Sequence, residues 1–365
     1  MTDTSSHRKQ TVRDLAAALR READGQPPLT VMHVCGTHEH EIGRWALRQL
    51  LPANVRLVAG PGCPVCITPA AAIVTAIALA RHASRPIVCA YGDIARTPTA
   101  AGSLLDARGE GADIRVIYDL HEPAALARRE PERRVVFFSI GFETTAAPVA
   151  AMLREDLPEN FSIYPCHRYV PTAVEALAKL DDGQIGGYLL PGHACVITGQ
   201  VAYDFLAQKY RQPAAVAGFE PEEILAGLLS IARQRQRGEP AVANCYRRVV
   251  RPEGNKRAQE ILFEVFELAD GAWRGIGVLP DTALLLREPY RRFDATAVFG
   301  VPEATGVEDV MPGCQCHLIM LGRKRPEECG LFAKACTPER PKGPCMVGGE
   351  GACRAHFLYP EVDNE

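Results

Sequence analysis

Seven cysteines in this chain have the spacing and the neighbours of thiols that bind metal or exchange electrons. Four lie in the C-terminal quarter and three near the N-terminus: Cys314, Cys329, Cys336 and Cys353, then Cys35, Cys63 and Cys66. The N-terminal segment is polar and helical in pattern, without an apolar secretory stretch, so we expect a reducing cytoplasm. In that compartment grouped cysteines indicate cluster ligands, zinc ligands or catalytic thiols rather than structural disulfides.

The C-terminal group is the strongest chemical signal. Iron–sulfur clusters are commonly held by four cysteines, so this group predicts a [4Fe-4S] cluster. Zinc remains an alternative, although structural zinc sites usually use tight pairs that this group lacks. Cys316 and Cys345 lie among the four, either as replacement ligands or as redox partners beside the cluster. The spacing does not decide whether Cys314 or Cys316 is the first ligand.

The pair Cys63 and Cys66 forms a CxxC motif at the expected start of a helix. A helix N-terminus lowers a thiol pKa, which favours a reactive thiolate or a reversible disulfide. A CxxC pair is also half of a zinc site. Because the chain has no second CxxC, thiol redox chemistry or iron ligation is the preferred interpretation.

Two further motifs place polar side chains beside possible reaction sites. Cys35 is followed by His38 and Glu39, and a neighbouring imidazole can activate a thiol by taking its proton. The alternative is a small buried residue at a strand end. Glu143 precedes two threonines and either supplies hydrogen bonds in a site or caps a helix. We interpret the remaining cysteines Cys89, Cys195 and Cys245 as buried apolar residues.

The elements that must position these residues alternate between short apolar strands and amphipathic helices, which predicts an α/β fold. The expected strands are residues 29–34, 55–59, 86–90, 114–118, 135–140, 161–164, 188–190 and 214–217. Each polar motif follows a strand, and in open parallel sheets ligands bind at the carboxyl ends of the strands. Although glycines in such loops also serve ordinary turns, the repetition predicts one shared cleft.

We therefore expect two parallel-sheet α/β domains facing a cleft, plus a small cysteine-rich iron–sulfur domain. Residues 1–130 would form the first, 131–245 the second, and 246–365 a helix at 251–270 followed by the cluster domain. The longest apolar run, 69–80, is too short to span a bilayer and predicts a buried helix. The net charge of −3, without a basic stripe, argues against nucleic acid as a partner.

Taken together, the motifs resemble those of the HypD family of [NiFe]-hydrogenase maturation factors. The resemblance rests on CGTHE at 35–39, GPGCPVC at 60–66, GFETT at 141–145, PGH at 191–193 and the four-cysteine spacing. It implies a scaffold on which an iron atom acquires cyanide and carbon monoxide. Two α/β domains and a domain with a [4Fe-4S] cluster are implied as well.

The resemblance also implies roles for individual residues. The thiol matching Cys35 would hold the transient Fe(CN)2CO unit together with a cysteine of a small HypC-type chaperone. Cys63 and Cys66 would serve thiol redox chemistry or iron binding, with electrons from the cluster. His38 would tune Cys35, and Glu143 would supply hydrogen bonds. A HypE-type cyanide donor would dock on this complex, and the hydrogenase large subunit would receive the iron indirectly.

Two rival functions fit part of the pattern. One is an iron–sulfur-linked thiol/disulfide oxidoreductase acting on a protein disulfide, which explains the thiols and the cluster but not the loop around Cys35. The other is a C-terminal zinc module for protein interaction. Whether the chain turns over a substrate by itself, and so counts as an enzyme, is left open by the sequence.

Overall fold

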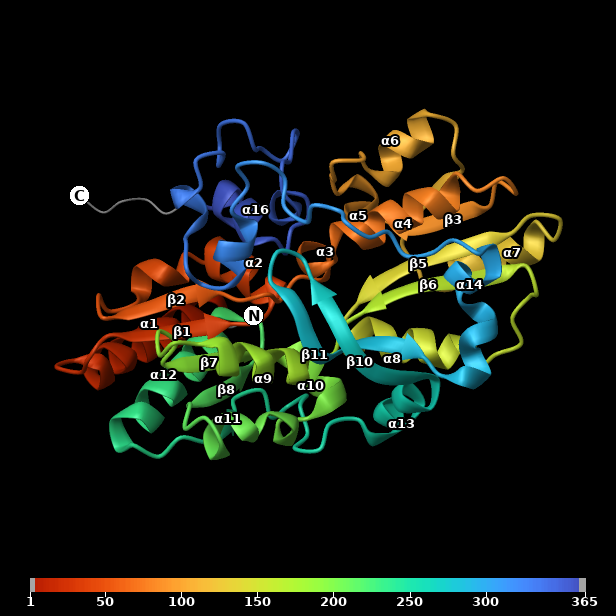
Figure 1. Cartoon of the computed structure of the whole chain (residues 1–365). Coiled ribbons are helices and arrows are strands. Elements are labelled where there is room, and N and C mark those ends of the chain that lie inside the picture. Colours follow the sequence, from red (N-terminus) through yellow and green to blue (C-terminus); the bar gives the residue numbers. More distant parts are fainter. Residues whose placement is uncertain (1–3, 361–365) are drawn as a thin grey trace.

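The computed structural model describes residues 4–360, which contain two parallel β-sheets (Figure 1). Sheet A has the order β2-β1-β7-β8-β9, with β1 Leu29–His33, β2 Val55–Ala59, β7 Gly187–Pro191, β8 Ala214–Ala217 and β9 Val242–Asn244. Sheet B has the order β4-β3-β5-β6, with β3 Ile87–Tyr91, β4 Ile114–Ile117, β5 Val135–Gly141 and β6 Phe161–His167. All eight predicted strands are present, so the α/β class is confirmed.

The two sheets are not built from consecutive halves of the chain. The chain leaves sheet A after β2, completes sheet B with β3 to β6, and returns to sheet A with β7. The predicted boundary between residues 130 and 131 therefore falls inside sheet B, where β3 pairs with β5. Local alternation of strands and helices shows where strands lie but not which strands pair, and this is why the predicted division does not match the sheets.

Sheet A is covered by helices on both faces. Alternate residues of a strand point to opposite faces, and Val31 and Met32 accordingly enter different cores. One core is closed by α1 Thr4–Ala23, α2 Gly36–Arg44 and α12 Pro221–Arg237. The other is closed by α9 Val170–Leu180, α10 Gly192–Thr198 and α11 Phe205–Gln208.

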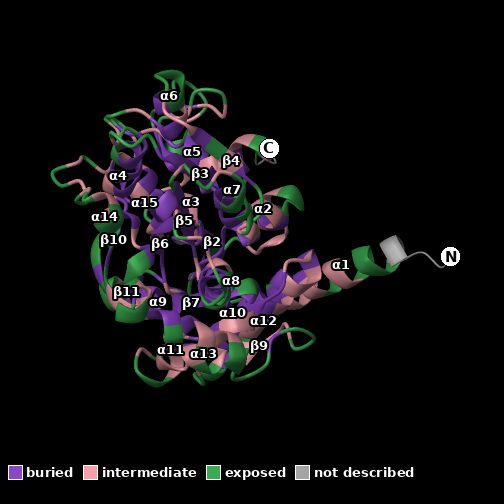
Figure 2. Ribbon diagram, turned by 90° about the vertical axis from the view of Figure 1, so that its right-hand side faces the viewer, coloured by how far each residue is buried: buried purple, intermediate pink, exposed green. Residues whose placement is uncertain are grey.

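Sheet B is enclosed in the same way. One face packs against α7 Glu122–Arg129, α8 Glu143–Leu153 and α13 Lys256–Val265. The other packs against α4 Ala70–Ala80, α5 Gly92–Arg96, α6 Leu104–Gly109 and α14 Ala295–Phe299. The apolar run at 69–80 is thus a buried helix, as predicted. Figure 2 shows buried residues concentrated in the strands and exposed ones in the outer helices and loops.

A hairpin of two antiparallel strands, β10 Phe266–Trp273 and β11 Gly277–Leu286, replaces part of the helix predicted at 251–270. Helix α13 ends at Val265, and the next residue already pairs with Leu286. The run after Val265 contains Ala, Asp and Gly, which are poor strand formers, so its pattern alone did not indicate a strand. Pairing with the distant β11 outweighs that local preference.

The C-terminal segment after residue 300 is mostly irregular, with short helices. Short elements elsewhere in the chain are α3 Pro64–Ile67, η1 Leu47–Leu50, η2 Val201–Tyr203 and η3 Glu288–Phe293. The C-terminal segment itself contains α15 Cys316–Met320, α16 Ala352–Leu358 and the 3-10 turns η4 Pro326–Glu328 and η5 Pro344–Met346. Its core consists largely of cysteines and includes Trp273 of the hairpin. Helices α13 and α14, assigned by sequence to this domain, pack on sheet B instead. Among residues 4–360, no helix is long and apolar enough to cross a membrane.

Candidate functional site

The loops that carry Cys35 and Cys63 lie side by side at the carboxyl ends of β1 and β2. Cys35 precedes α2 and Cys63 precedes α3, each as the N-cap residue. The two loops are joined by a hydrogen bond from the Gly36 N–H to the Gly62 carbonyl, at 2.9 Å. A Cβ atom on Gly62 would lie 2.2 Å from the backbone nitrogen of Cys35, so only glycine allows this approach.

A continuous series of sulfur contacts leads away from these loops. The Cys66 thiol donates to Cys63 Sγ at 2.8 Å. Cys345 is a close neighbour of Cys66 in the same buried cluster, and its thiol influences the pKa of Cys66. Cys345 in turn neighbours Cys316 and Cys353, whose thiols influence its own pKa. All thirteen cysteines are free thiols. The pair predicted for redox chemistry is therefore connected through Cys345 to the C-terminal cysteines.

The C-terminal cysteines line one small cavity, which we call the cysteine cavity. Its wall contains the four predicted ligands and both uncertain cysteines: Cys314, Cys316, Cys329, Cys336, Cys345 and Cys353. The other lining residues are apolar or glycine, among them Leu331, Phe332 and Met346. Such a donor set in a dry environment fits an iron–sulfur cluster.

Two details of the cavity wall strengthen that fit. A Cβ atom on Gly343 would lie 2.5 Å from Cys314 Sγ, so the glycine leaves room beside the thiol. The Lys342 N–H donates to Cys336 Sγ at 3.2 Å, the kind of hydrogen bond that stabilises a thiolate ligand. Within the described residues, no three His, Cys, Asp or Glu side chains converge closely enough to hold a single metal ion.

The thiol loops are covered rather than open to a cleft. Cys35, Cys63 and Cys66 are 7 %, 5 % and 1 % exposed. The C-terminal segment covers them: Thr37 Oγ1 donates to Glu350 Oε1 at 2.9 Å, and Glu350 lies against Gly36. The pattern of motifs predicted the position of these thiols at strand ends, but it did not predict that the C-terminal segment covers them.

Burial also changes the expected chemistry of these thiols. It raises the pKa of Cys35 to about 12 and that of Cys66 well above its usual range. The imidazole of His38 is held by a hydrogen bond between its Nε2 and the Gly218 carbonyl at 2.8 Å, and its Nδ1 has no hydrogen-bond partner among the described residues. Burial lowers the pKa of His38 to about 3. The backbone N–H of His38 supports Cys35, and activation of this thiol by the imidazole stays a prediction.

Glu143 opens helix α8 at the end of β5 and is fully buried. Its Oε1 accepts a hydrogen bond from the Val170 N–H at 2.6 Å, while Oε2 has no partner. Burial raises the pKa of this carboxyl to about 8, so it is protonated at neutral pH. The protonated Oε2 is therefore a hydrogen-bond donor without a partner among the described residues. Three other cysteines were predicted to be buried. Cys89 and Cys195 are buried, whereas Cys245 is only partly buried.

Sequence reasoning missed two groups that hold the site together. Arg274, in the turn of the hairpin, is 1 % exposed and donates from Nε to the Thr68 carbonyl at 2.7 Å. Its charge acts on Cys66, and no local pattern marks it. The second group centres on Glu39, whose carboxylate is bonded to Arg48 and, at 2.9 Å, to His356 Nε2. The position of Glu39 at the end of the CGTHE motif was the sequence signal that could have indicated this role.

Nearly the whole chain is similar to known proteins. The family model described as "HypD: Hydrogenase formation hypA family" matches residues 10–360. Hydrogenase maturation factor HypD2 of Bradyrhizobium diazoefficiens is 42 % identical, covering 96 % of this chain and 94 % of that protein. Hydrogenase maturation factors HypD of Azotobacter vinelandii and Escherichia coli are 41 % and 38 % identical, covering 96 % and 93 % of this chain and 94 % and 91 % of theirs.

Proposed function

The chain belongs to the HypD family of hydrogenase maturation factors, and we propose that it assembles the Fe(CN)2CO unit of the [NiFe] active site on Cys35. Because burial disfavours the free thiolate of Cys35, that sulfur ionises only against a cation, and iron supplies one. Soft thiolate ligands suit iron that carries cyanide and carbon monoxide. A cysteine of a HypC-type chaperone completes the ligation, a HypE-type protein donates cyanide, and the large subunit receives the product.

The observation that carries the proposal is the row of neighbouring thiols that runs from Cys63 and Cys66 through Cys345 to the cysteine cavity. A [4Fe-4S] cluster would be held by Cys314, Cys329, Cys336 and Cys353, and when bound it supplies single electrons close to these thiols. Two pairs of cysteines in the chain then pass the electrons on by thiol–disulfide exchange. Cys316 and Cys345 are the donor pair, and Cys63 and Cys66 are the acceptor pair.

The exchange takes place in two balanced steps. In the first, the Cys345 thiolate attacks Cys66 Sγ of a Cys63–Cys66 disulfide, and Cys63 leaves as a thiolate that takes up a proton. In the second, the Cys316 thiolate attacks Cys345 Sγ and releases Cys66. Two electrons have then moved from the Cys316–Cys345 pair, now a disulfide, to the dithiol beside Cys35.

Infrared spectroscopy tests the iron assignment. The protein is purified anaerobically after co-expression with HypC-type and HypE-type partners, and cyanide and carbonyl stretching bands are measured. Cys35→Ala is expected to abolish the bands, whereas Cys245→Ala, a partly buried cysteine outside the site, should leave them unchanged. Bands of full strength in the Cys35 variant would place the iron elsewhere and favour a plain disulfide oxidoreductase.

Thiol counting tests the exchange separately. Cys345→Ser should keep the iron and sulfide content of the wild type but leave the Cys63–Cys66 disulfide unreduced after a reductant is added to the cluster. Reduction of that disulfide at the wild-type rate in Cys345→Ser would remove Cys345 from the electron path.

A further inference from the structure

The last residue of β1, His33, is a buried imidazole next to the Cys35 loop. Its exposed fraction is 1 %. Alternate residues of a strand share a face, so His33 lies on the same side of sheet A as Val31, where α2 packs. Both ring nitrogens have partners: Nδ1 lies 3.2 Å from the Cys35 carbonyl oxygen, and Nε2 is bonded to Glu39 Oε2. Because a carbonyl oxygen only accepts, Nδ1 carries a hydrogen and is the donor of its bond.

The peptide group between Cys35 and Gly36 is held at both ends. Its carbonyl accepts from His33 Nδ1 and from the Glu39 N–H, each at 3.2 Å. Its N–H, which belongs to Gly36, donates to the Gly62 carbonyl at 2.9 Å. A peptide group is planar, so bonds at its two ends fix the orientation of the whole plane. This restricts the direction in which the Cys35 side chain leaves the backbone.

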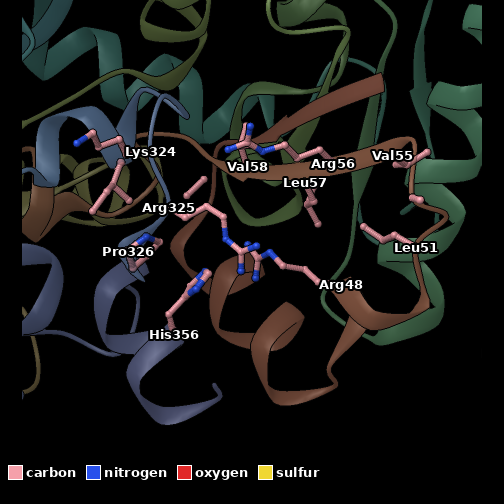
Figure 3. A pocket seen from close by; sticks show the side chains of 13 residues that line it. Arg48, Leu51, Val55, Arg56, Leu57, Val58, Lys324, Arg325, Pro326 and His356 are labelled. Atoms are coloured by element: carbon pink, nitrogen blue, oxygen red, sulfur yellow. The ribbon is translucent and has the colours of Figure 1, made fainter. Parts of the chain in front are cut away.

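On its other side His33 joins a network that reaches the cysteine-rich segment. The Glu39 carboxylate accepts from Arg48 Nη2 at 2.8 Å and pairs with His356 Nε2 at 2.9 Å. Figure 3 shows Arg48 of η1 and His356 of α16 pointing toward each other. Helix α16 also carries Cys353, a predicted cluster ligand. A continuous row of bonds thus links the thiol loop to the helix that carries this cysteine.

The polar atoms of this row are all paired. Both nitrogens of His33 and of His356, and both carboxylate oxygens of Glu39, have partners. A buried hydrogen-bond network with every member satisfied holds a single geometry. An imidazole that only filled the space between β1 and α2 would need no particular bond at Nδ1.

We propose that His33 is a positioning residue for iron binding by Cys35. Its Nδ1–H holds the Cys35 carbonyl and thereby the direction of the thiol, and its bond to Glu39 ties that position to α16. The inference rests on the proposed assembly of the Fe(CN)2CO unit on Cys35 and adds a residue outside the CGTHE motif. Groups that orient a metal ligand from behind typically change metal affinity by about 10-fold to 100-fold.

Two substitutions separate the two bonds of His33. Asparagine places an amide N–H near the position of Nδ1, and glutamine places one near the position of Nε2. His33→Asn therefore keeps the bond to Cys35, whereas His33→Gln keeps only the bond to Glu39. The matched control is His167→Gln, because His167 is also a buried histidine at the end of a strand, with Nε2 at 2.9 Å from Ser139 Oγ.

The first measurement uses the full chain, purified anaerobically after co-expression with HypC-type and HypE-type partners. Cyanide and carbonyl infrared bands are divided by protein concentration, and urea unfolding shows whether each variant is folded. Folded His33→Gln should lose at least about tenfold in band intensity, while His33→Asn and His167→Gln stay within about twofold of wild type. Full intensity in His33→Gln, or equal loss in both His33 variants, would overturn the proposal.

The second measurement does not depend on iron. The chain is expressed without partners, and mass spectrometry follows the alkylation of Cys35 by iodoacetamide, with the buried Cys195 as the internal reference. Release of the Cys35 peptide group should speed alkylation of Cys35 by at least about tenfold in His33→Gln and leave it unchanged in His33→Asn. Equal rates in wild type and His33→Gln would refute the positioning role. Absence of infrared bands from wild type would count against the proposed iron chemistry alone, and the alkylation rates would still decide the role of His33.

Discussion

Replacement of His356 by glutamine is expected to remove a pH-dependent part of the stability of this protein. His356 is 6 % exposed and joins two carboxylates, with Nε2 at 2.9 Å from Glu39 Oε1 and Nδ1 at 2.5 Å from Glu327 Oε1. Burial alone would lower the pKa of His356. The two carboxylates outweigh burial and raise the pKa from 6.5 to about 9.

The size and sign of the effect follow from that shift. A rise from 6.5 to about 9 corresponds to about 3 kcal/mol of preferential stabilisation of the protonated folded state. Because the pKa of the folded state lies above that of the unfolded state, this contribution is complete below pH 6.5 and is lost as the pH rises through about 9. Glutamine keeps a hydrogen-bonding side chain but carries no titrating charge.

Anaerobic urea unfolding between about pH 6 and pH 10 measures the contribution. Wild type should exceed His356→Gln in unfolding free energy by about 3 kcal/mol at the acidic end, and the difference should shrink towards zero at the alkaline end. His121→Gln, an exposed histidine at the start of α7, is the control and should follow wild type throughout. A difference between wild type and His356→Gln that stays constant with pH would refute the assigned ion-pair network.

Two further predictions concern the cysteine cavity and the buried carboxyl. Gly343→Ala places a methyl group 2.5 Å from Cys314 Sγ and should lower the iron and sulfide content of anaerobically purified protein. Gly330→Ala, which has open space around it, is the control and should keep that content. Full iron content in Gly343→Ala would contradict the assignment of Cys314 as a cluster ligand beside this glycine. The folded pKa of Glu143, near 8, lies above its ordinary value of 4.5, so wild type should lose stability as the pH rises through that window. Glu143→Gln should lose none of it, and equal pH slopes in urea unfolding would show that the carboxyl is ionised when folded.

The sequence was sufficient to predict what depends on short segments. Strand positions, the apolar helix α4 and the location of motifs after strands all follow from patterns within a few residues. The motif around Cys35 also predicted a thiol at the end of β1, where the structure places it. Such features need no knowledge of distant parts of the chain.

What escaped prediction depends on pairs of residues far apart in the sequence. The proton affinity of Cys35 is set mainly by its burial under the loop of Glu350. The hairpin exists because Phe266 meets Leu286, although its first strand has weak local preference. The role of Glu39 as the centre of an ion-pair network required His356, more than three hundred positions later.

The interleaved order of the sheets explains why the reactive groups lie between them. The chain passes from sheet A to sheet B immediately after Cys63 and Cys66, and it returns just after Val170, which donates to Glu143. The hairpin fastens both passages, because the Arg274 N–H donates to the Ile67 carbonyl and the Tyr169 N–H donates to the Thr282 carbonyl. A fold with two consecutive sheets would have a single connection at this place. Two connections held by one hairpin place the thiol pair and the protonated carboxyl at the same junction, under the cysteine-rich segment.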